Sequence, residues 1–524
     1  MKRLLPLLLL LTACTSGAAP IGHAPPTDAR PDGVVRIGIT RPATVDPGNA
    51  YEPMSDLVTR TLCDPLILAD PKTGALTPSL VQTWVVSDSG QRLVLRLKRG
   101  LRFSDGSALT ADDVAFSLSR IASADYAGAV ADRLSTIDGY AEVHGDTETD
   151  SDADRRRLRG VRVLDQQSLE ITLTSRQAGF LQLLTSPLVS PVSQAAAERD
   201  PASFARQPIC SGPFALEKSY LPGDSVIALR PVRRGYPDRI EFHVVADPAA
   251  AQRAGKVDLA AAGPSDTANV ERSPGPLVDF LSFPTATGPL FDRPAVRRAL
   301  ALALDRQALV DTVYPGTRVP ATGFLPPTAL PTFHADACAD LPVRGSVSRA
   351  RQLLAGVDLS DVRVKYVVNA DGRNVALAKA VAAQWKAAFG LTATVVALPY
   401  KDFLAQPGTD VSRFSWATSY PDADGSLFPL FSTDRIGRDN VSHYSSPTFD
   451  RALTRLAREA TDDADRQLAY RDAEQVLCTD LPMVPLTFSL ARFLVAPSLG
   501  TTSVYVDRTT GLPQVRDLYA RSTP

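Results

Sequence analysis

Residues 76–121 read LTPSLVQTWVVSDSGQRLVLRLKRGLRFSDGSALTADDVAFSLSRI, and three local signals follow one another in the second half of this stretch. The segment LVLRL at 93–97 alternates between apolar and polar residues, which is typical of a strand with one buried face. The triplet SDG at 104–106 predicts a turn. Acidic residues and an amphipathic pattern then follow Thr110, so we expect a helix from about Ala111 to Ile121 with Thr110 as its N-cap.

Strands and helices alternate along the rest of the chain as well. VRVKYVV at 362–368, a helical pattern from about Val375 to Phe389, and LTATVVAL at 391–398 predict a β-α-β unit. The stretch 293–314, RPAVRRALALALDRQALVDTVY, predicts one long helix. This alternation favours an α/β protein built in layers.

The composition is that of a folded globular protein with several domains. A chain of 524 residues is too long for one hydrophobic core, so two or three domains are expected. The hydrophobic fraction of 44% and charged fraction of 22% are ordinary. A formal net charge of -1 argues against a nucleic-acid-binding protein, which would show a basic excess.

The first residues predict export. Lys2 and Arg3 precede an apolar run that ends in Leu-Thr-Ala-Cys, which is the pattern of a secretory signal peptide over residues 1–13. This ending resembles a bacterial lipobox, and the resemblance implies lipidation of Cys14; the alternative is a simple cleaved signal. The following residues to 33 are rich in proline and small residues and predict a flexible tether. No later segment reaches the roughly 20 apolar residues of a membrane span, so we expect attachment through the N-terminal lipid alone.

Four further cysteines remain, and an even number in an exported chain suggests disulfides with three possible connectivities. The alternative is four buried free thiols. Their spacing does not resemble a zinc site. They are Cys63, Cys210, Cys338 and Cys478.

The sequence contains no arrangement that predicts catalysis. Motifs for nucleophilic hydrolases, dinucleotide or phosphate loops and zinc proteases are absent, and the five histidines are scattered. The two acidic residues of ADD at 111–113, Asp112 and Asp113, are explained by the start of a helix, where the dipole favours them. We therefore expect no enzyme activity, no cofactor and no metal, and retain a secreted hydrolase as the alternative.

The opening stretch resembles the signature block of solute-binding protein family 5, the extracytoplasmic peptide-, dipeptide- and nickel-binding components of ABC importers. The shared order runs through Pro-x-Leu, Trp, Ser-Asp, an alternating strand, Arg-Gly, Phe-x-Asp-Gly, Leu-Thr and Asp-Asp-Val. The resemblance extends from about residue 34 to 520. Further segments that carry it are SGPFALEKSYLPGD at 211–224, AGKVDLA at 254–260, FDRPAVRRALALALDRQALV at 291–310, YPDADGSLFPLF at 420–431 and LPMVPL at 481–486.

This resemblance implies a type II periplasmic-binding-protein fold, in which two lobes linked by crossing hinge strands close like a clamshell. Lobe one would span 34–281, with an inserted subdomain at about 50–168, and lobe two would span 282–483. Residues 484–524 would return to lobe one. Cys63 and Cys210 would then fall in lobe one and Cys338 and Cys478 in lobe two, which predicts one disulfide within each lobe.

The implied function is that of a lipid-anchored extracytoplasmic binding protein. It would capture peptides or peptide-like solutes and deliver them, as a monomer, to an ABC permease and its ATPase. A nickel–chelator complex as the ligand is an alternative, and so is a receptor that senses peptides without uptake.

The segment FSWATSYPDAD at 414–424 is the predicted ligand wall. In peptide-binding relatives the matching segment faces the cleft, and the residue that pairs with the peptide ammonium is commonly an aspartate. Here that position is Ser419, so either Asp422 or Asp424 replaces it, or the ligand has no free amine at this point. Further ligand contacts are expected from Trp416, Thr418, Tyr420 and Asn440, and from Thr40 or Arg41 of lobe one.

Overall fold

The computed structural model describes residues 26–522 except 31, 88, 127–130, 146–155, 178, 233–236, 287–288, 330–332, 334, 407, 418–419, 421, 458–459 and 461. The predicted signal peptide, the predicted lipidation site Cys14 and most of the predicted tether lie outside the described residues. Within them, no helix combines the length and apolar character that a membrane crossing requires.

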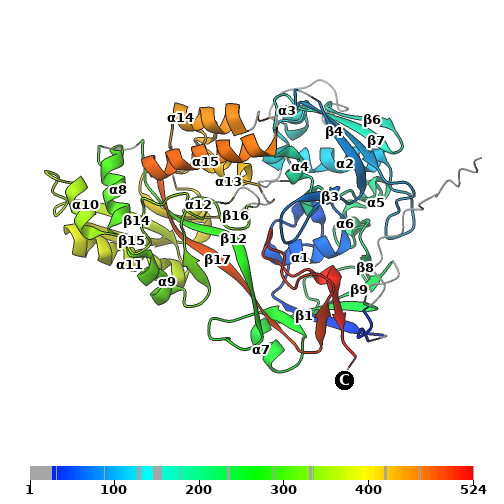
Figure 1. Ribbon diagram of the computed structural model, residues 1–524. Coiled ribbons are helices and arrows are strands. Elements are labelled where there is room, and N and C mark those ends of the chain that lie inside the picture. The colour runs from blue at the N-terminus through cyan, green and yellow to red at the C-terminus, as the bar shows by residue number, and fades with distance from the viewer. Residues whose placement is uncertain are drawn as a thin grey trace, which may run out of the picture.

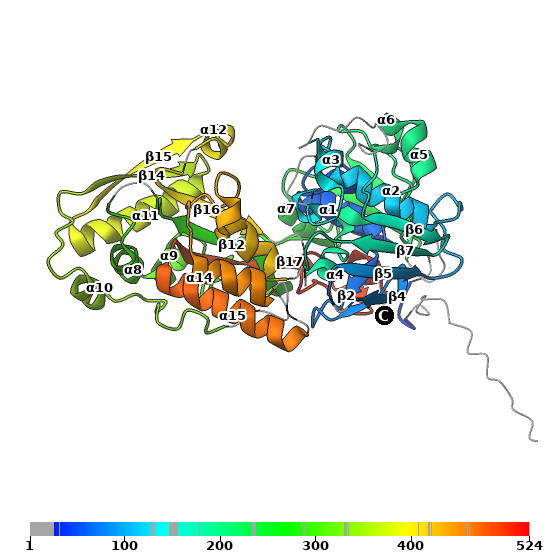
Figure 2. The same ribbon diagram turned by 90° about the horizontal axis from the view of Figure 1, so that it is seen from above.

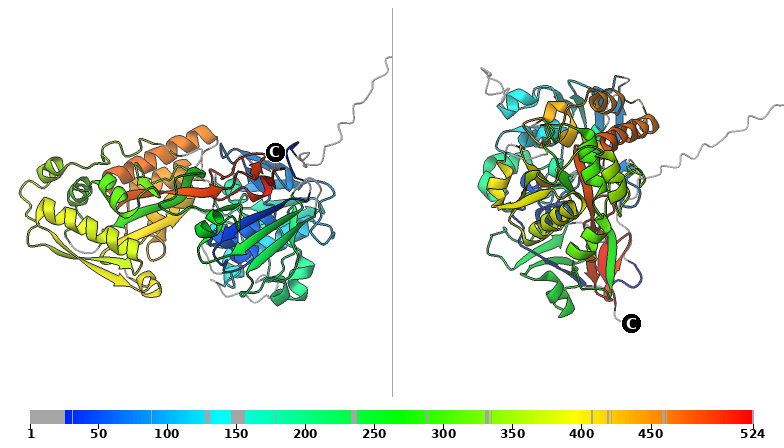
Figure 3. Two further views of the ribbon diagram at one scale, coloured as in Figure 1. Left: turned by 90° about the horizontal axis from the view of Figure 1, so that it is seen from below. Right: turned by 90° about the vertical axis from the view of Figure 1, so that its left-hand side faces the viewer.

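Two lobes are joined by two long strands, β12 (Val270–Ser282) and β17 (Met483–Val495) (Figures 1 and 2). The chain enters lobe two through β12 and returns through β17, and the two strands run side by side between the lobes (Figure 3). One sheet continues through both lobes in the order β15-β14-β16-β12-β17-β11-β1-β10-β9-β8, with β13 also paired to β17. The predicted two-lobe α/β fold is therefore confirmed.

Lobe one contains the N-terminal and C-terminal parts of the chain. Its main elements are β1 (Val34–Ile39), α1 (Pro53–Leu62), α5 (Gln194–Arg199), α6 (Pro201–Phe204), β8 (Phe214–Leu216), β9 (Val226–Pro231), β10 (Arg239–Val244), α7 (Pro248–Arg253), β11 (Leu259–Ala261), β18 (Leu499–Thr501) and β19 (Leu518–Ala520). A subdomain of lobe one is built from β2 (Ile67–Ala69), β3 (Leu76–Pro78), β4 (Val81–Val86), β5 (Arg92–Leu97), α2 (Ala111–Ala122), η2 (Ala131–Leu134), α3 (Tyr140–His144), β6 (Val161–Asp165), β7 (Ser168–Thr172) and α4 (Phe180–Leu183).

Lobe two is a sheet covered by helices. Its elements are α8 (Pro294–Leu302), α9 (Arg306–Val313), β13 (Arg318–Pro320), α10 (Val347–Leu353), β14 (Arg363–Asn369), α11 (Gly372–Phe389), β15 (Thr392–Leu398), α12 (Tyr400–Leu404), β16 (Val411–Ala417), α13 (Asp424–Phe431), α14 (Pro447–Asp450), a π-helix (Arg451–Ala457) and α15 (Asp463–Asp480). The predicted β-α-β unit is present, since β14 and β15 pair in parallel on either side of α11.

Three hydrophobic clusters correspond to these parts. One fills lobe two, one fills the main body of lobe one, and one fills the subdomain between Ala50 and Val189. Tyr420 is the exception, because it follows a lobe-two strand yet packs within the cluster of the subdomain.

The signature block folds as its local signals predict. Helix α2 begins directly after Thr110, whose backbone N–H donates to the Asp113 carboxylate at 2.9 Å as part of a capping box. Strand β5 buries Leu93, Leu95 and Leu97 and exposes or half-exposes the residues between them.

The prediction of one long helix over 293–314 is wrong, because α8 ends at Leu302 and α9 begins at Arg306. Asp305 accepts a hydrogen bond from Ala308 N at 2.9 Å and so caps the second helix. Gln384 Oε1 accepts from Asp305 N at 2.7 Å and fixes the break. The fully buried Arg306 directly after the break donates to three backbone carbonyls.

The strands that join the lobes are irregular at one place. Their register shifts between Pro274 and Val278 of β12, where Leu277 N donates to the side chain of Ser489 at 3.0 Å instead of to a backbone carbonyl. A Cβ on Gly275 would lie 2.3 Å from Ser489 Oγ, so only glycine allows this approach. A bulge of this kind bends the strand and leaves the ladder locally unpaired.

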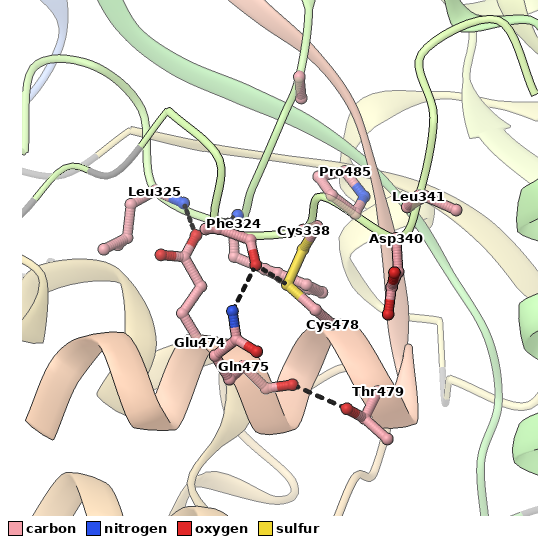
Figure 4. Close-up of a disulfide and its surroundings, with 12 residues drawn as sticks. Phe324, Leu325, Cys338, Asp340, Leu341, Glu474, Gln475, Cys478, Thr479 and Pro485 are labelled. Atoms are coloured by element: carbon pink, nitrogen blue, oxygen red, sulfur yellow. Dashed lines mark hydrogen bonds between the residues drawn. A yellow bond between two sulfur atoms is a disulfide. The ribbon is translucent and has the colours of Figure 1, made fainter.

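The structure places one disulfide in each lobe, which is the pairing implied by the family resemblance. Cys63 is bonded to Cys210 in lobe one, and Cys338 is bonded to Cys478 at the end of α15 in lobe two (Figure 4). Neither bond crosses the strands that join the lobes.

The first and last described segments meet on lobe one. Arg30 N donates to Ala520 O at 2.8 Å, and Tyr519 Oη donates to Asp28 Oδ1 at 3.0 Å. The first and last described segments therefore lie side by side in lobe one beside β1. Lobe two is formed by residues from the middle of the chain.

Glu474, one turn before Cys478 on α15, is a buried carboxyl whose titration should affect stability (Figure 4). It is 1% exposed and accepts the backbone N–H groups of Phe324 at 2.6 Å and Leu325 at 3.1 Å. Burial raises the pKa of Glu474 from its ordinary 4.5 to about 7, although the two backbone hydrogen bonds act in the opposite direction.

The folded protein therefore holds a proton that the unfolded chain loses between pH 4.5 and 7, so this group's contribution to the free energy of unfolding falls as pH rises through that window. We expect Glu474→Gln to gain about 3 kcal/mol relative to the wild type between pH 4.5 and 8, as measured by urea unfolding. Glu198→Gln, on exposed α5, is the control for losing a surface carboxylate. A Glu474→Gln difference that does not change with pH would contradict the prediction.

Candidate functional site

Trp416 lies near the end of β16, on the strand that pairs directly with β12. Its ring is half-buried and stacks on Phe414, with 6.2 Å between the ring centroids and 20° between the ring planes. Its indole Nε1 donates to Gly425 O at 3.0 Å. The predicted wall residue is thus held on lobe two next to the strands that join the lobes.

A pocket lined in part by Phe414 lies on the same face of β16 as Trp416, because alternate residues of a strand share a face. Its wall comes from α12, from β14 and β16, and from the segments before β16 and after α13. Most of the wall is apolar, and one carboxylate lies at its edge. The lining residues are Val367, Phe403, Leu404, Gln406, Gly408, Thr409, Asp410, Ser412, Phe414 and Val441. A concave apolar surface with a few polar groups is the usual form of a small-molecule site.

A buried charged cluster occupies the other face of the sheet in lobe two. The fully buried Asp279 carboxylate pairs with Arg413 and, at 2.9 Å, with Arg318 Nη1. Ser415 and Thr487 donate hydroxyl hydrogen bonds to the same carboxylate. These five side chains carry two positive charges and one negative, so the cluster has an excess positive charge, and Arg318 is partly exposed.

Tyr420 and Asp422 belong to a contact between the lobes. Tyr420 is 2% exposed within the subdomain core, and Asp422 is fully buried. Asp422 Oδ2 lies 2.6 Å from Arg466 Nη1 of α15, and its Oδ1 accepts from Asp424 N at 2.8 Å. Burial raises the pKa of Asp422, and the Arg466 guanidinium opposes that rise.

The same arginine contacts lobe one. With its amide carbonyl facing the guanidinium, Gln182 of α4 accepts from Arg466 Nη2 at 2.9 Å and Nη1 at 3.2 Å. A Cβ on Gly179 would lie 3.2 Å from Asp422 Oδ1, so the backbone of lobe one packs directly against this carboxylate. We call the group formed by Gly179, Gln182, Tyr420, Asp422 and Arg466 the interlobe joint.

The remaining predicted site residues are dispersed. Thr418 and Ser419 lie outside the described residues. Asn440 is fully buried, and its amide donates to Ser432 O at 3.0 Å and Tyr444 O at 2.8 Å. A ligand contact from Asn440 would require these loop bonds to open, and it stays a prediction.

Thr40 and Arg41 follow β1 in lobe one, and both are exposed. Arg41 donates to the carbonyls of Pro222 and Asp224. Their contact with a ligand also stays a prediction.

Sequence reasoning missed the cavity and the charged cluster. The spacing of Phe414 and Trp416 in a strand does place both on one face, and this signal could have indicated a continuous aromatic wall. No local signal identifies Arg318 or Arg466, because their carboxylate partners are distant in sequence.

Comparison with known proteins gives the following matches. Residues 75–438 match a family described as bacterial extracellular solute-binding proteins, family 5 Middle. The probable deoxycholate-binding periplasmic protein YgiS of Escherichia coli (strain K12) is 28% identical over 488 residues, which cover 88% of this chain and 88% of that protein. Di/tripeptide-binding protein 3 of Pseudomonas aeruginosa (strain UCBPP-PA14) is 26% identical over 536 residues, which cover 93% of this chain and 94% of that protein.

A solved structure shares the fold. The periplasmic murein tripeptide binding protein MppA, in its unliganded open form, superposes with a TM-score of 0.77 at 21% sequence identity. The superposition covers 96% of this chain and 99% of that one.

Proposed function

Because the chain belongs to the bacterial extracellular solute-binding proteins of family 5, we propose that it captures a peptide or peptide-like solute between its two lobes and delivers it to the permease of an ABC importer. Members of this family are binding components of transporters that work with a permease and an ATPase. The proposal includes an extracytoplasmic location, lipid attachment through Cys14, a monomeric state and no catalytic activity.

The observation that carries the proposal is the pair of strands β12 and β17. They connect two separately cored lobes, and their bulge lies between the segments that pair within each lobe. A ligand that contacts both lobes binds the closed state more tightly and so shifts the population toward it. The permease would then distinguish the loaded protein from the empty one by its closed shape.

The chemistry of lobe two supports a ligand with an apolar group. The pocket lined in part by Phe414 offers it an apolar wall, whereas Arg318 and Arg413 pair with Asp279 on the opposite face of the sheet. The two relatives are named for di- and tripeptides and for deoxycholate, and both classes include apolar groups. Peptides are favoured because the resemblance of the 414–424 segment is to peptide-binding members.

Native mass spectrometry of the purified protein, followed by release and identification of any bound solute, is the first test. After unfolding and refolding to remove that solute, calorimetric titration would compare trileucine, its C-terminal amide, its N-acetyl form, deoxycholate and nickel–EDTA. We expect trileucine to bind. Amidation removes the ligand's carboxylate, and a loss of affinity of about tenfold or more would indicate a charge-assisted contact to that group. N-acetylation should change affinity little, because Ser419 supplies no charge to an ammonium.

Two results of these experiments would count against the proposal. Binding of deoxycholate or nickel–EDTA without binding of any peptide would overturn the peptide assignment. Appearance of peptide cleavage products would favour the secreted hydrolase instead.

A further inference from the structure

We infer that Arg133, a residue of the lobe-one subdomain, is a positioning residue for the ligand wall in lobe two, where it sets the orientation of the Trp416 ring. This inference rests on the proposed function, because Trp416 is a ligand contact only if that function holds. The contact itself, however, is a property of the empty protein and is testable without any ligand.

Arg133 lies on η2, far from Trp416 in sequence but next to it in space. Its side chain is buried, with 7% of the residue exposed. The guanidinium carbon lies 5.8 Å from the centroid of the Trp416 ring, within the distance at which a cation is attracted to an aromatic face. The ring therefore contacts an element of the opposite lobe before any ligand arrives.

The two side chains also share one acceptor. Gly425 O accepts from Trp416 Nε1 at 3.0 Å and from Arg133 Nη2 at 3.3 Å. Rotation of the indole would break its own hydrogen bond and at the same time separate its face from the guanidinium. Together with the stacked Phe414, these contacts define one orientation of the ring.

The chain just before this carbonyl is held to lobe one by the interlobe joint. Gly425 follows Asp422 by three residues, and Asp422 packs against Gly179. Arg176 of lobe one adds a hydrogen bond from its Nη2 to Ala460 O at 2.5 Å. Arg133 is thus part of a larger buried contact that fixes segment 420–425 against the subdomain, so the ring orientation depends on how the two lobes sit on each other.

The direct test is fluorine NMR of the full, unliganded protein labelled with 5-fluorotryptophan. The chain has three tryptophans, Trp84, Trp385 and Trp416, and single Trp→Phe variants assign their signals. We expect Arg133→Ala to shift or broaden the Trp416 signal and to leave the other two in place. The control is Arg159→Ala, an exposed arginine of the same subdomain that pairs with Asp138.

The functional test is a double-mutant cycle with trileucine as the probe. Arg133→Ala should weaken binding by up to about tenfold, because a ring that is no longer positioned must be ordered when the ligand binds. The same substitution in a Trp416→Ala background should have little effect, because its target is gone. Arg133→Lys, which keeps the charge but not the planar group, should give an intermediate loss and serves if the alanine variant does not fold.

Two results would overturn the inference: an unchanged Trp416 signal, or signals of all three tryptophans that change together. An equal loss of affinity with and without the Trp416 ring would overturn it as well. Absence of any trileucine binding counts against the proposed function alone, because the NMR comparison still decides whether Arg133 positions the ring.

Discussion

Replacing Asp422 with alanine is expected to lower the free energy of unfolding by about 3–5 kcal/mol, the cost of breaking a buried ion pair from one side. Asp422 is fully buried and Arg466 is 2% exposed, so the substitution removes the counter-charge of a guanidinium that water does not reach. Urea unfolding followed by circular dichroism would measure the loss. The control is Asp402→Ala on exposed α12, which should change stability by less than about 0.5 kcal/mol.

A double substitution separates the possible causes of this loss. Asp422→Leu combined with Arg466→Met replaces both charges with apolar groups, and it should recover much of the stability that Asp422→Ala loses. If Asp422→Ala lowers the free energy of unfolding by less than about 1 kcal/mol, the Asp422–Arg466 pair behaves like an exposed ion pair. The interlobe joint would then not be a buried contact.

Removal of the lobe-two disulfide by Cys338→Ala with Cys478→Ala should cost about 5 kcal/mol by the chain-entropy estimate for a loop of this length. The bond closes a loop with a sequence separation of 140, and its loss releases that loop in the unfolded chain. Calorimetry without reductant would measure the fall in melting temperature. Peptide mapping without reductant would verify the pairing first.

The lobe-one disulfide is the matched control for this experiment. Cys63 and Cys210 are separated by 147 residues, so their double alanine variant should lose nearly the same stability. Because each bond lies within one lobe, we expect each variant to lower the free energy of unfolding of the lobe that has lost its disulfide. A wild-type melting temperature that is insensitive to reductant would contradict both expectations.

Elements that depend on local interactions could be predicted from the sequence. The start of α2 at Thr110 depends on a capping box formed within four residues, and the β14-α11-β15 unit depends on periodicity within each element. The break between α8 and α9 could not be predicted in the same way. The alanine- and leucine-rich pattern around Asp305 favours a continuous helix, and Gln384 helps to fix the break from another element.

The site depends far more on distant contacts. Trp416 could be placed by the family resemblance, whereas the partner of Asp422 is Arg466, 44 residues later, and the arginine beside the Trp416 ring comes from the other lobe. Tyr420 has an aromatic ring with a polar tip and was expected at the ligand. Its packing into the subdomain core depends on how the two lobes contact each other, and the hydrophobic periodicity of the sequence does not predict that contact.

The meeting of residues 28–30 with residues 519–521 has a mechanical consequence. Tension applied through the N-terminal segment enters the molecule at lobe one, where the C-terminal segment is already paired with it. The chain connects lobe two to lobe one through β12 and β17, and the interlobe joint adds side-chain contacts; residues 28–30 and 519–521 belong to neither. A pull on the N-terminal side would therefore not strain the bulge at Gly275.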